Sequence, residues 1–233
     1  MLVVSWNIRQ GGGKRADSIA QKLIGRSPDV LVLGEYMTGV SATLIEQLSA
    51  AGWTHHSIVE PPERLGGVAI LSRAPVERVP VPIGLESLGF RYQAVRIPAL
   101  DLELRAIYAP LHQDPYREFW ESALDSLEAD SGRPVLVVGD LNMGASGIDS
   151  PAKDVFCDRF FRQLPGRGYS DLWRRTNGAD AREYTWHGRV NPYRLDHAFG
   201  SPAIVGRLVG CSYDHRVREA GLSDHSLLAV ELR

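Results

Sequence analysis

Apolar runs and helical periodicity alternate along the first fifty residues. Residues 2–8 and 30–34 are apolar and rich in β-branched side chains, which is typical of buried strands. Between these runs, the apolar positions of residues 15–26 recur at helical spacing. Ser41 is suited to begin a second helix and Gly52 to end it. The pattern predicts a strand, a helix, a strand and a helix in this order.

Residues 68–108 are patterned differently, because short apolar runs follow one another without helical segments between them. Glycine and proline separate the runs, which is typical of antiparallel strands. The predicted strands are residues 68–71, 76–81, 92–97 and 102–108. We therefore expect a largely antiparallel arrangement in this part of the chain.

The second half of the chain combines helices with strands again. Asp114 followed by Pro115 is a typical helix start, and apolar residues at helical spacing continue as far as Gly132. Three more strands are predicted at residues 135–138, 195–199 and 227–232. Because helices accompany strands in both halves, the pattern favours two sheets packed face to face with helices outside them.

Composition places the chain among ordinary globular proteins. Its 233 residues are 44% hydrophobic and 23% charged, which excludes disordered and collagen-like chains. Without repeats or a long linker, residues 1–233 are expected to form one domain. No apolar run approaches the roughly 18 to 20 residues of a membrane span and no leader is recognisable, so we expect a cytoplasmic protein, and a monomer. Cys157 and Cys211 fit no zinc or redox spacing and are expected to be buried thiols.

Charge is distributed unevenly along the chain. The net charge of −2 argues against a protein that wraps nucleic acid through general basicity. Within residues 155–195, however, arginines outnumber acidic residues and alternate with aromatic side chains; Arg174, Arg175 and Arg194 belong to this stretch. Such a mixture is suited to a groove for a phosphodiester backbone and its bases. A solvated arginine face over core aromatics is an equally weighted alternative.

Polar side chains stand at the ends of the apolar strands, where a carboxylate is costly unless something compensates it. They are Asn7, Glu35, Tyr108, Asp140, Asn142, Asp196 and the segment Ser223-Asp224-His225. If these ends converge, several carboxylates share one pocket, and a bound cation relieves their repulsion. Oxygen ligands without cysteine favour Mg²⁺ or Mn²⁺ over zinc. With a histidine that titrates near neutrality, the set suits metal-assisted attack of water on a phosphoryl centre.

Eight short motifs occur in one order along the chain. They are Ser5-Trp6-Asn7-Ile8, Leu33-Gly34-Glu35, residues 67–72, Ile107-Tyr108-Ala109-Pro110, Gly139-Asp140-Leu141-Asn142, Tyr184-Thr185-Trp186, Arg194-Leu195-Asp196-His197 and Ser223-Asp224-His225. Each is weak alone, but together they resemble the endonuclease/exonuclease/phosphatase superfamily, which includes exonuclease III-like apurinic-site endonucleases, deoxyribonuclease I, sphingomyelinases and inositol polyphosphate 5-phosphatases. The resemblance covers nearly the whole chain and implies an α+β fold, the four-layer α/β/β/α sandwich of deoxyribonuclease I.

The resemblance implies a metal site and a catalytic set. Glu35 is implied as the principal ligand of Mg²⁺ or Mn²⁺, with Asn7 and Asp224 beside it. Asp140 would orient or deprotonate the attacking water, and Asn142 would hold that water or a phosphoryl oxygen. The implied catalytic set is completed by Asp196, which would hydrogen-bond His225 and set its tautomer, and by Tyr108, which would contact the phosphate or the leaving oxygen.

The resemblance is less specific about the substrate. Trp186, Tyr193 and Leu195 fall where the apurinic endonucleases build an aromatic pocket for the abasic sugar. In those enzymes the motif tyrosine is usually followed by x-Pro-Asn, whereas here Leu111 replaces the asparagine, and His112 after it is expected to face the substrate. The chain is also short for a protein that grips a duplex. A single strand or a smaller phosphodiester is therefore an alternative to duplex DNA.

Taken together, these residues predict a divalent-metal-dependent phosphodiesterase, a nuclease that acts on DNA or RNA. The alternatives are a phosphomonoesterase or a lipid or inositol phosphate phosphodiesterase of the same superfamily. A binding module that has lost its chemistry would be expected to lack one of Glu35, Asp140, Asp224 or His225, and all four are present.

Several residues near the motifs also have a plain structural interpretation. Asn7 could cap a turn, and Trp6 is expected in the core. Thr185 and Ser223 are expected either to bond the backbone only or to steady a catalytic neighbour. Asp171 is expected to cap a helix.

Overall fold

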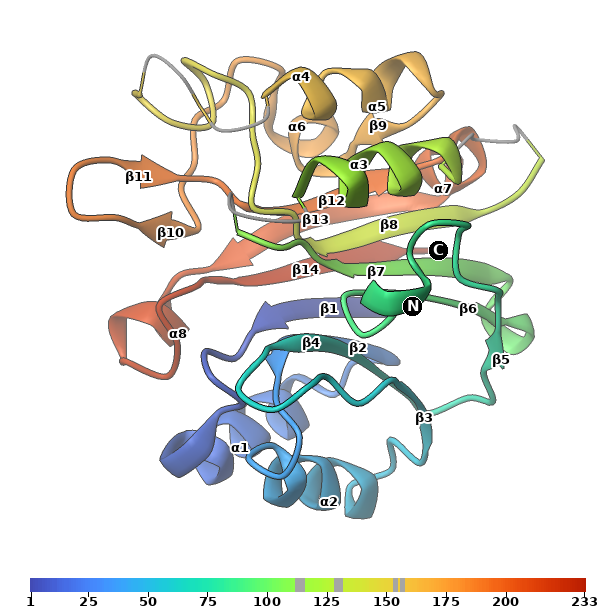
Figure 1. The fold of residues 1–233 in the computed structure, drawn as a ribbon, viewed down its shortest axis with the longest axis vertical. Helices are drawn as coiled ribbons and strands as arrows, with labels where there is room; N and C mark the ends of the chain where they lie inside the picture. Colours follow the sequence, from blue (N-terminus) through green and yellow to red (C-terminus); the bar gives the residue numbers. More distant parts are fainter. Residues whose placement is uncertain (112–115, 128–131, 153–154, 156–157) are drawn as a thin grey trace.

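The computed structural model describes residues 1–233 apart from 112–115, 128–131, 153–154 and 156–157 (Figure 1). Two six-stranded mixed sheets pack face to face, and helices cover the outer face of each sheet (Figure 1). The predicted four-layer α/β/β/α sandwich is thereby confirmed. His112 and the predicted helix start at Asp114 and Pro115 lie outside the described residues.

The first sheet has the strand order β13-β14-β1-β2-β4-β3. Its strands are β1 (Leu2–Asn7), β2 (Val30–Tyr36), β3 (His55–Ile58), β4 (Gly67–Ser72), β13 (Leu208–Asp214) and β14 (Leu227–Leu232). β1 pairs in parallel with β2 and antiparallel with β14. This register pairs Asn7, at the end of β1, with Gly34, the residue before Glu35.

The second sheet has the order β5-β6-β7-β8-β12-β9. Its strands are β5 (Glu77–Arg78), β6 (Tyr92–Ile97), β7 (Leu102–Tyr108), β8 (Val135–Asp140), β9 (Ser170–Asp171) and β12 (Asp196–Gly200). β7 and β8 run in parallel and pair Tyr108 with Asp140, whereas β12 runs antiparallel to β8 and pairs Asp196 with Asp140. A separate hairpin of β10 (Trp186–His187) and β11 (Pro192–Tyr193) projects from one side of the molecule (Figure 1).

Helices cover the sheets from outside. The helices are α1 (Ala16–Arg26), α2 (Ala42–Ala50), α3 (Tyr116–Asp125), α4 (Asp158–Phe161), α5 (Gln163–Gly166), α6 (Leu172–Asn177), α7 (Pro202–Arg207), α8 (Arg216–Glu219), and the 3-10 helices η1 (Gly13–Arg15), η2 (Glu86–Leu88) and η3 (Pro98–Leu100). α1 and α2 pack on the first sheet, and α3, α4 and α5 pack on the second (Figure 1). Among the described residues, none of these helices combines the length and apolarity needed to cross a membrane.

The alternation of side chains along each strand builds three apolar layers. Val30 and Val32 of β2 pack into the core between the sheets, whereas Leu31 and Leu33 of the same strand pack against α1 and α2. A third cluster lies between the second sheet and the helices α3 to α5. Cys211 is a buried free thiol in the core between the sheets, as expected, and Cys157 lies outside the described residues.

Several predicted boundaries differ from the structure. The strand predicted at residues 76–81 is confined to β5, because Pro80 and Pro82 carry no backbone N–H to continue a ladder. β3 and β13 were not predicted, since polar residues interrupt their apolar pattern. The helix predicted as far as Gly132 ends at Asp125. Ser41 begins α2 without a side-chain cap, because its hydroxyl oxygen accepts the N–H of Met37 instead of an N–H of the helix.

Candidate active site

The polar strand ends converge at one edge of the two packed sheets. β1 and β2 end there because they are parallel, and β7 and β8 end there for the same reason. β12 begins at this edge because it is antiparallel to β8. β8 contacts both β1 and β2 across the interface between the sheets. Carboxylates from both sheets therefore meet, although their positions in the sequence are far apart.

Asn7 joins the two sheets at this edge. Its Nδ2 donates to Glu35 Oε1 at 3.0 Å and to Asp140 Oδ2 at 2.9 Å. Its Oδ1 accepts the backbone N–H of Arg9 at 2.9 Å, which uses one of the two lone pairs of this oxygen. Asn7 does cap a turn, as its structural interpretation proposes, but the same side chain also holds two carboxylates in place.

The backbone around Glu35 aims its carboxylate at this site. Glu35 lies at an irregularity in the pairing of β2 with β4. Its φ of +57° is a backbone conformation that residues other than glycine rarely adopt. Its Oε2 accepts the backbone N–H of Gln10 at 2.6 Å. Gly66 lies so close that a Cβ there would be 3.2 Å from the Cα of Glu35. Strain in β2 is thus accommodated where the carboxylate is presented.

Asp140, His225 and Asp196 form a buried row. His225 Nδ1 is 2.8 Å from Asp196 Oδ2, which is the hydrogen bond expected from the sequence, and His225 Nε2 is 3.8 Å from Asp140 Oδ2. Trp6 is buried, as expected, and its Nε1 donates to the His225 carbonyl. The imidazole is therefore oriented by an acid on one side and faces a second acid on the other.

The pKa values of this row follow from burial and from its charges. Burial raises the pKa of Asp140 to about 7, with the nearby Asp196 acting in the same direction and His225 opposing it. Burial lowers the pKa of His225, but Asp196 and Asp140 more than offset this and raise it to about 10. At neutral pH the imidazole therefore holds a proton, while Asp140 is poised to accept one.

Two polar residues hold the Asp196 and His225 strands. The Thr185 hydroxyl accepts the N–H groups of Leu195 and Asp196 at 3.0 and 3.2 Å. The Ser223 hydroxyl donates to the Asn7 carbonyl at 2.6 Å and accepts the His225 N–H at 3.1 Å. Both side chains therefore bond only to backbone groups and, through them, steady residues of the site.

Asn142 and Gly139 shape the turn after β8. The N–H of Asn142 donates to Asp140 Oδ1 at 3.0 Å, and its Nδ2 donates to the carbonyl of Ala109 at 2.8 Å. A Cβ at Gly139 would lie 1.9 Å from the carbonyl oxygen of Ile107, so only glycine fits between β8 and β7. The Gly-Asp-x-Asn motif thus has a packing reason as well as a chemical one.

Tyr108 closes another side of the site. It is buried, and burial raises the pKa of its hydroxyl above the usual range, with Glu35 and Asp140 contributing in the same direction. The guanidinium carbon of Arg91 lies 5.0 Å from the centre of its ring. Arg91 was missed from the sequence because it belongs to no motif. Only the pairing of β6 with β7 brings it to the site.

The β10–β11 hairpin and Asp224 form the rim. Trp186 Nε1 donates to Asp224 Oδ2 at 3.3 Å, and the Trp186 ring lies 6.4 Å from the imidazole of His225. Tyr193 packs on Trp186 at 6.0 Å between ring centres. Arg9 Nε is 4.0 Å from Asp224 Oδ1. The half-buried Trp186 and Tyr193 thus lie together at the rim, with Trp186 beside His225.

The donor set of this site fits a hard divalent cation. Asp140, Asp196 and His225 bring potential ligand atoms within 4.8 Å of one another, but the His225 ring is protonated and bonded to Asp196, so only the carboxylate oxygens can bind a cation. Among the described residues, Oδ1 of Asp196 and Oδ1 of Asp224 are buried without a hydrogen-bond partner. Buried carboxylate oxygens without donors are costly unless a cation satisfies them. Glu35 contributes further oxygen to the same region through its contact with Asn7.

Two arginines predicted to bind substrate are engaged within the protein. Arg194 has 0% of its side chain exposed, donates from Nε to Asp149 Oδ1 at 2.6 Å and from Nη2 to Asp171 Oδ2 at 2.5 Å. The prediction that it binds substrate is wrong, because its charge is consumed by buried acids. Arg174 is also bound by Asp149 and by backbone carbonyls, whereas Arg175 is exposed.

The aromatic groove predicted for residues 155–195 is corrected in a similar way. Four of its aromatics are buried in the core, namely Phe160, Phe161, Tyr169 and Trp173. For these residues the alternative interpretation holds, since they are core side chains beneath arginines. Asp171 caps α6 through the Arg174 N–H, as expected. Leu195 is half-buried, and its carbonyl accepts the N–H of Leu141.

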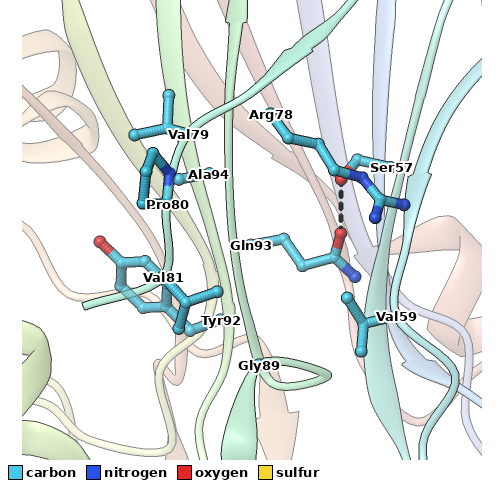
Figure 2. Close-up of a pocket in the computed structure, with 10 residues that line it drawn as sticks. All are labelled: Ser57, Val59, Arg78, Val79, Pro80, Val81, Gly89, Tyr92, Gln93 and Ala94. Carbon is cyan, nitrogen blue, oxygen red and sulfur yellow. Dashed lines mark hydrogen bonds between the residues drawn. The ribbon is translucent and has the colours of Figure 1, made fainter. Parts of the chain in front are cut away.

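A cavity of about 320 Å³ lies on another side of the molecule, between the edge strands of the two sheets (Figure 2). Its polar groups are paired with one another or with the backbone. Ser57 Oγ donates to Gln93 Oε1 at 2.7 Å (Figure 2). Gln93 Nε2 donates to the carbonyl of Val68, and Arg78 donates to that of Ile58. No catalytic arrangement is formed by its described lining residues.

The chain is similar to known proteins over nearly all of its length. The model of the Endonuclease/Exonuclease/phosphatase family matches residues 4–225. A search of curated proteins finds no match.

Solved structures share the fold. An AP endonuclease from Archaeoglobus fulgidus has a TM-score of 0.84 at 19% identity, with 100% of this chain and 99% of that chain covered. The 3′ phosphatase NExo from Neisseria, bound to product DNA hairpin, has a TM-score of 0.82 at 20% identity, with the same 100% and 99% coverage. An endonuclease/exonuclease/phosphatase from Beutenbergia cavernae has a TM-score of 0.71 at 22% identity and covers 100% of this chain and 71% of that chain.

Proposed function

The chain belongs to the endonuclease/exonuclease/phosphatase family of phosphoric ester hydrolases, and we propose that it is a divalent-metal-dependent phosphodiesterase that cleaves nucleic acid. The observation that carries this proposal is the link that Asn7 makes between Glu35 and Asp140, beside the Asp196–His225 pair. Acids from both sheets are held close together there, which is stable only with a compensating charge.

Glu35 and Asp224 would hold Mg²⁺ or Mn²⁺, and Asn7 keeps Glu35 in place and has an amide oxygen that could join them. The bound ion would polarise a phosphoryl oxygen of the substrate. Asp224 is kept at the rim by its hydrogen bond with Trp186. We therefore propose Asn7, Glu35 and Asp224 as the ligands, as the resemblance implies.

The remaining residues divide the proton transfers. Asp140, whose pKa is about 7, accepts a proton from the attacking water. His225 is protonated and oriented by Asp196, and it would donate a hydrogen bond to the phosphate. Asn142 is bound to Asp140 through its N–H and is placed to hold the water or a phosphoryl oxygen. Tyr108 stays protonated, because its pKa is raised, and is a donor to the leaving oxygen.

Nucleic acid is the favoured substrate because Trp186 and Tyr193 stand beside His225, where they can stack on a base or a sugar. The similarity in fold to a DNA-bound 3′ phosphatase supports a second candidate, the removal of a phosphate from a 3′ end. The two reactions are separated by the bond broken. A phosphodiesterase shortens an intact oligonucleotide, whereas a phosphomonoesterase releases inorganic phosphate from a 3′-phosphorylated one without shortening it.

The test is a panel of abasic duplex, linear and nicked DNA, single-stranded DNA, RNA and inositol phosphates, each assayed with Mg²⁺, with Mn²⁺ and with excess chelator. We expect cleavage of a nucleic acid that the chelator abolishes and either metal restores. Asp140→Asn should lower kcat by about 10²- to 10⁴-fold. Asp125→Asn is the matched control, since that side chain is 83% exposed on α3. Full activity in chelator, or in Asp140→Asn, would contradict the proposal.

A further inference from the structure

Arg91 lies at the edge of the site, and three backbone hydrogen bonds fix residues 90 and 91. Its N–H donates to the carbonyl of Leu88 at 2.7 Å, and its own carbonyl accepts the N–H of Tyr108 at 2.9 Å. The carbonyl of the preceding Phe90 accepts the N–H of Val68 at 2.7 Å. Residue 91 is therefore tied to both β4 and β7, and its position relative to Tyr108 is set by the fold.

Two glycines allow this approach. A Cβ at Gly67 would lie 2.6 Å from the carbonyl oxygen of Phe90, which a real side chain does not tolerate. A Cβ at Gly66 would lie 3.1 Å from Cε1 of Tyr108 and 3.2 Å from the Cα of Glu35. The bare backbone of residues 66–67 thus lets Glu35 of β2, Tyr108 of β7 and the Arg91 segment crowd together.

The Arg91 guanidinium rests on two aromatic rings and forms a side-chain hydrogen bond with Tyr108. Its central carbon lies 5.0 Å from the ring centre of Tyr108 and 5.3 Å from that of Phe90. Within the part of the chain that the structure describes, no carboxylate forms an ion pair with it. Burial lowers the pKa of Arg91, and Tyr108, Glu35 and Asp140 act against this, so these groups lie within its electrostatic reach.

An arginine in this position would help an anionic substrate to bind beside the carboxylates. A phosphate anion must approach a cluster of carboxylates, and attraction from a fixed cation lowers the cost of that approach. The planar guanidinium presents several N–H donors in a geometry that matches phosphate oxygens. Stacking on Tyr108 and Phe90 restricts its orientation in advance of binding.

We propose that Arg91 binds a non-bridging oxygen of the phosphate group under attack and holds that group beside Tyr108. This inference rests on the proposed hydrolase function and adds a substrate-binding residue to it. It assigns the positive charge that receives the phosphate to Arg91, within electrostatic reach of Glu35 and Asp140.

The test compares Arg91→Gln and Arg91→Lys with Arg96→Gln. Arg96 lies on β6, which begins one residue after Arg91, and it is exposed and pairs with Glu103, so it controls for the loss of one surface charge. Two quantities are measured: binding of inorganic phosphate by ³¹P NMR titration with Mg²⁺ present, and kcat/KM on the best substrate of the panel. Phosphate binding needs no turnover, so it tests Arg91 independently of the activity. A wild-type protein that binds phosphate but cleaves no ester would contradict only the proposed function.

We expect Arg91→Gln to lower kcat/KM by on the order of 10²-fold and to weaken phosphate binding, with a smaller loss for Arg91→Lys, which keeps charge but loses the planar fork. Arg96→Gln should match the wild type in both. If Arg91→Gln binds phosphate and turns over like Arg96→Gln, the inference is overturned. Should Arg91→Gln not fold, Arg91→Lys decides, and wild-type phosphate binding and turnover in that variant would overturn it equally.

Discussion

Asn7 and Asp140 are 133 positions apart in the sequence, yet Asn7 Nδ2 donates a hydrogen bond to Asp140 Oδ2 at 2.9 Å. The two residues end strands of different sheets, so this bond crosses the interface between the sheets at the candidate active site. The same nitrogen also donates to Glu35. One neutral amide therefore spaces two acids that would otherwise repel each other.

Removing this amide should disrupt the site while the fold persists. We expect Asn7→Ala to lower kcat/KM by at least about 10²-fold, because Glu35 and Asp140 lose their shared donor. Asn7→Asp should be more severe, since it adds another carboxylate. Steady-state kinetics with Mg²⁺ measure the effect, and Asn177→Ala, on the exposed end of α6, is the control. Activity of Asn7→Asp equal to the wild type would refute this role.

Metal binding should be visible as stability as well as activity. A cation that binds only the folded state, at a free concentration of 100 times its Kd, stabilises that state by about 2.7 kcal/mol. We expect Mg²⁺ to raise the Tm of the wild type and of Glu46→Gln, an exposed control on α2, and to raise that of Glu35→Gln much less. Differential scanning calorimetry with and without Mg²⁺ measures this, and equal rises in all three proteins would exclude Glu35 as a ligand.

Arg194 should matter for stability through its charge. It is buried between Asp149 and Asp171, so Arg194→Met takes the buried cation away from two acids that then share only Arg174. Breaking a buried ion pair in this way costs about 3 to 5 kcal/mol in the free energy of unfolding. Urea denaturation measures the loss. Arg175→Met on the exposed part of the same basic stretch should change it by no more than about 0.5 kcal/mol, and a similar small loss for Arg194→Met would show that the pair is dispensable.

Asp214 should make the protein sensitive to acid. Its side chain is 3% exposed and lies 2.9 Å from Lys22 Nζ and 3.0 Å from both Arg26 and Arg216. Burial raises its pKa, but Arg216 and Lys22 more than offset this and hold the pKa of the carboxyl well below its usual range. Its stabilisation is therefore fully present above the unfolded pKa of about 3.9 and is lost as the pH falls below it.

Asp214→Asn tests this assignment. The variant should be less stable than the wild type at pH 7, and the difference should shrink as the pH is lowered below about 4. Urea denaturation between pH 2 and pH 7 measures both effects. Asp101→Asn is the control, because that side chain is 84% exposed beside Arg207. A stability difference that does not change with pH would rule out the charge of Asp214 as its cause.

The sequence by itself determined most strands and the identity of the polar residues at their ends. The limits of β6, β7 and β14 agree with the apolar runs, because burial on one or both faces leaves a local pattern in the chain. The motifs predict that Asp196 pairs with His225, and the two side chains form a hydrogen bond of 2.8 Å. Residue type and strand position are local properties, so they can be read from the chain directly.

Tertiary structure alone decided which charges are available. Arg194 and Arg175 belong to one basic stretch, but the first is buried between two acids and the second is exposed. Arg91 carries no sequence signal and reaches the site through the pairing of β6 with β7. The reason is physical: the environment of a charged group depends on contacts between residues distant in sequence, and these exist only once the two sheets have packed.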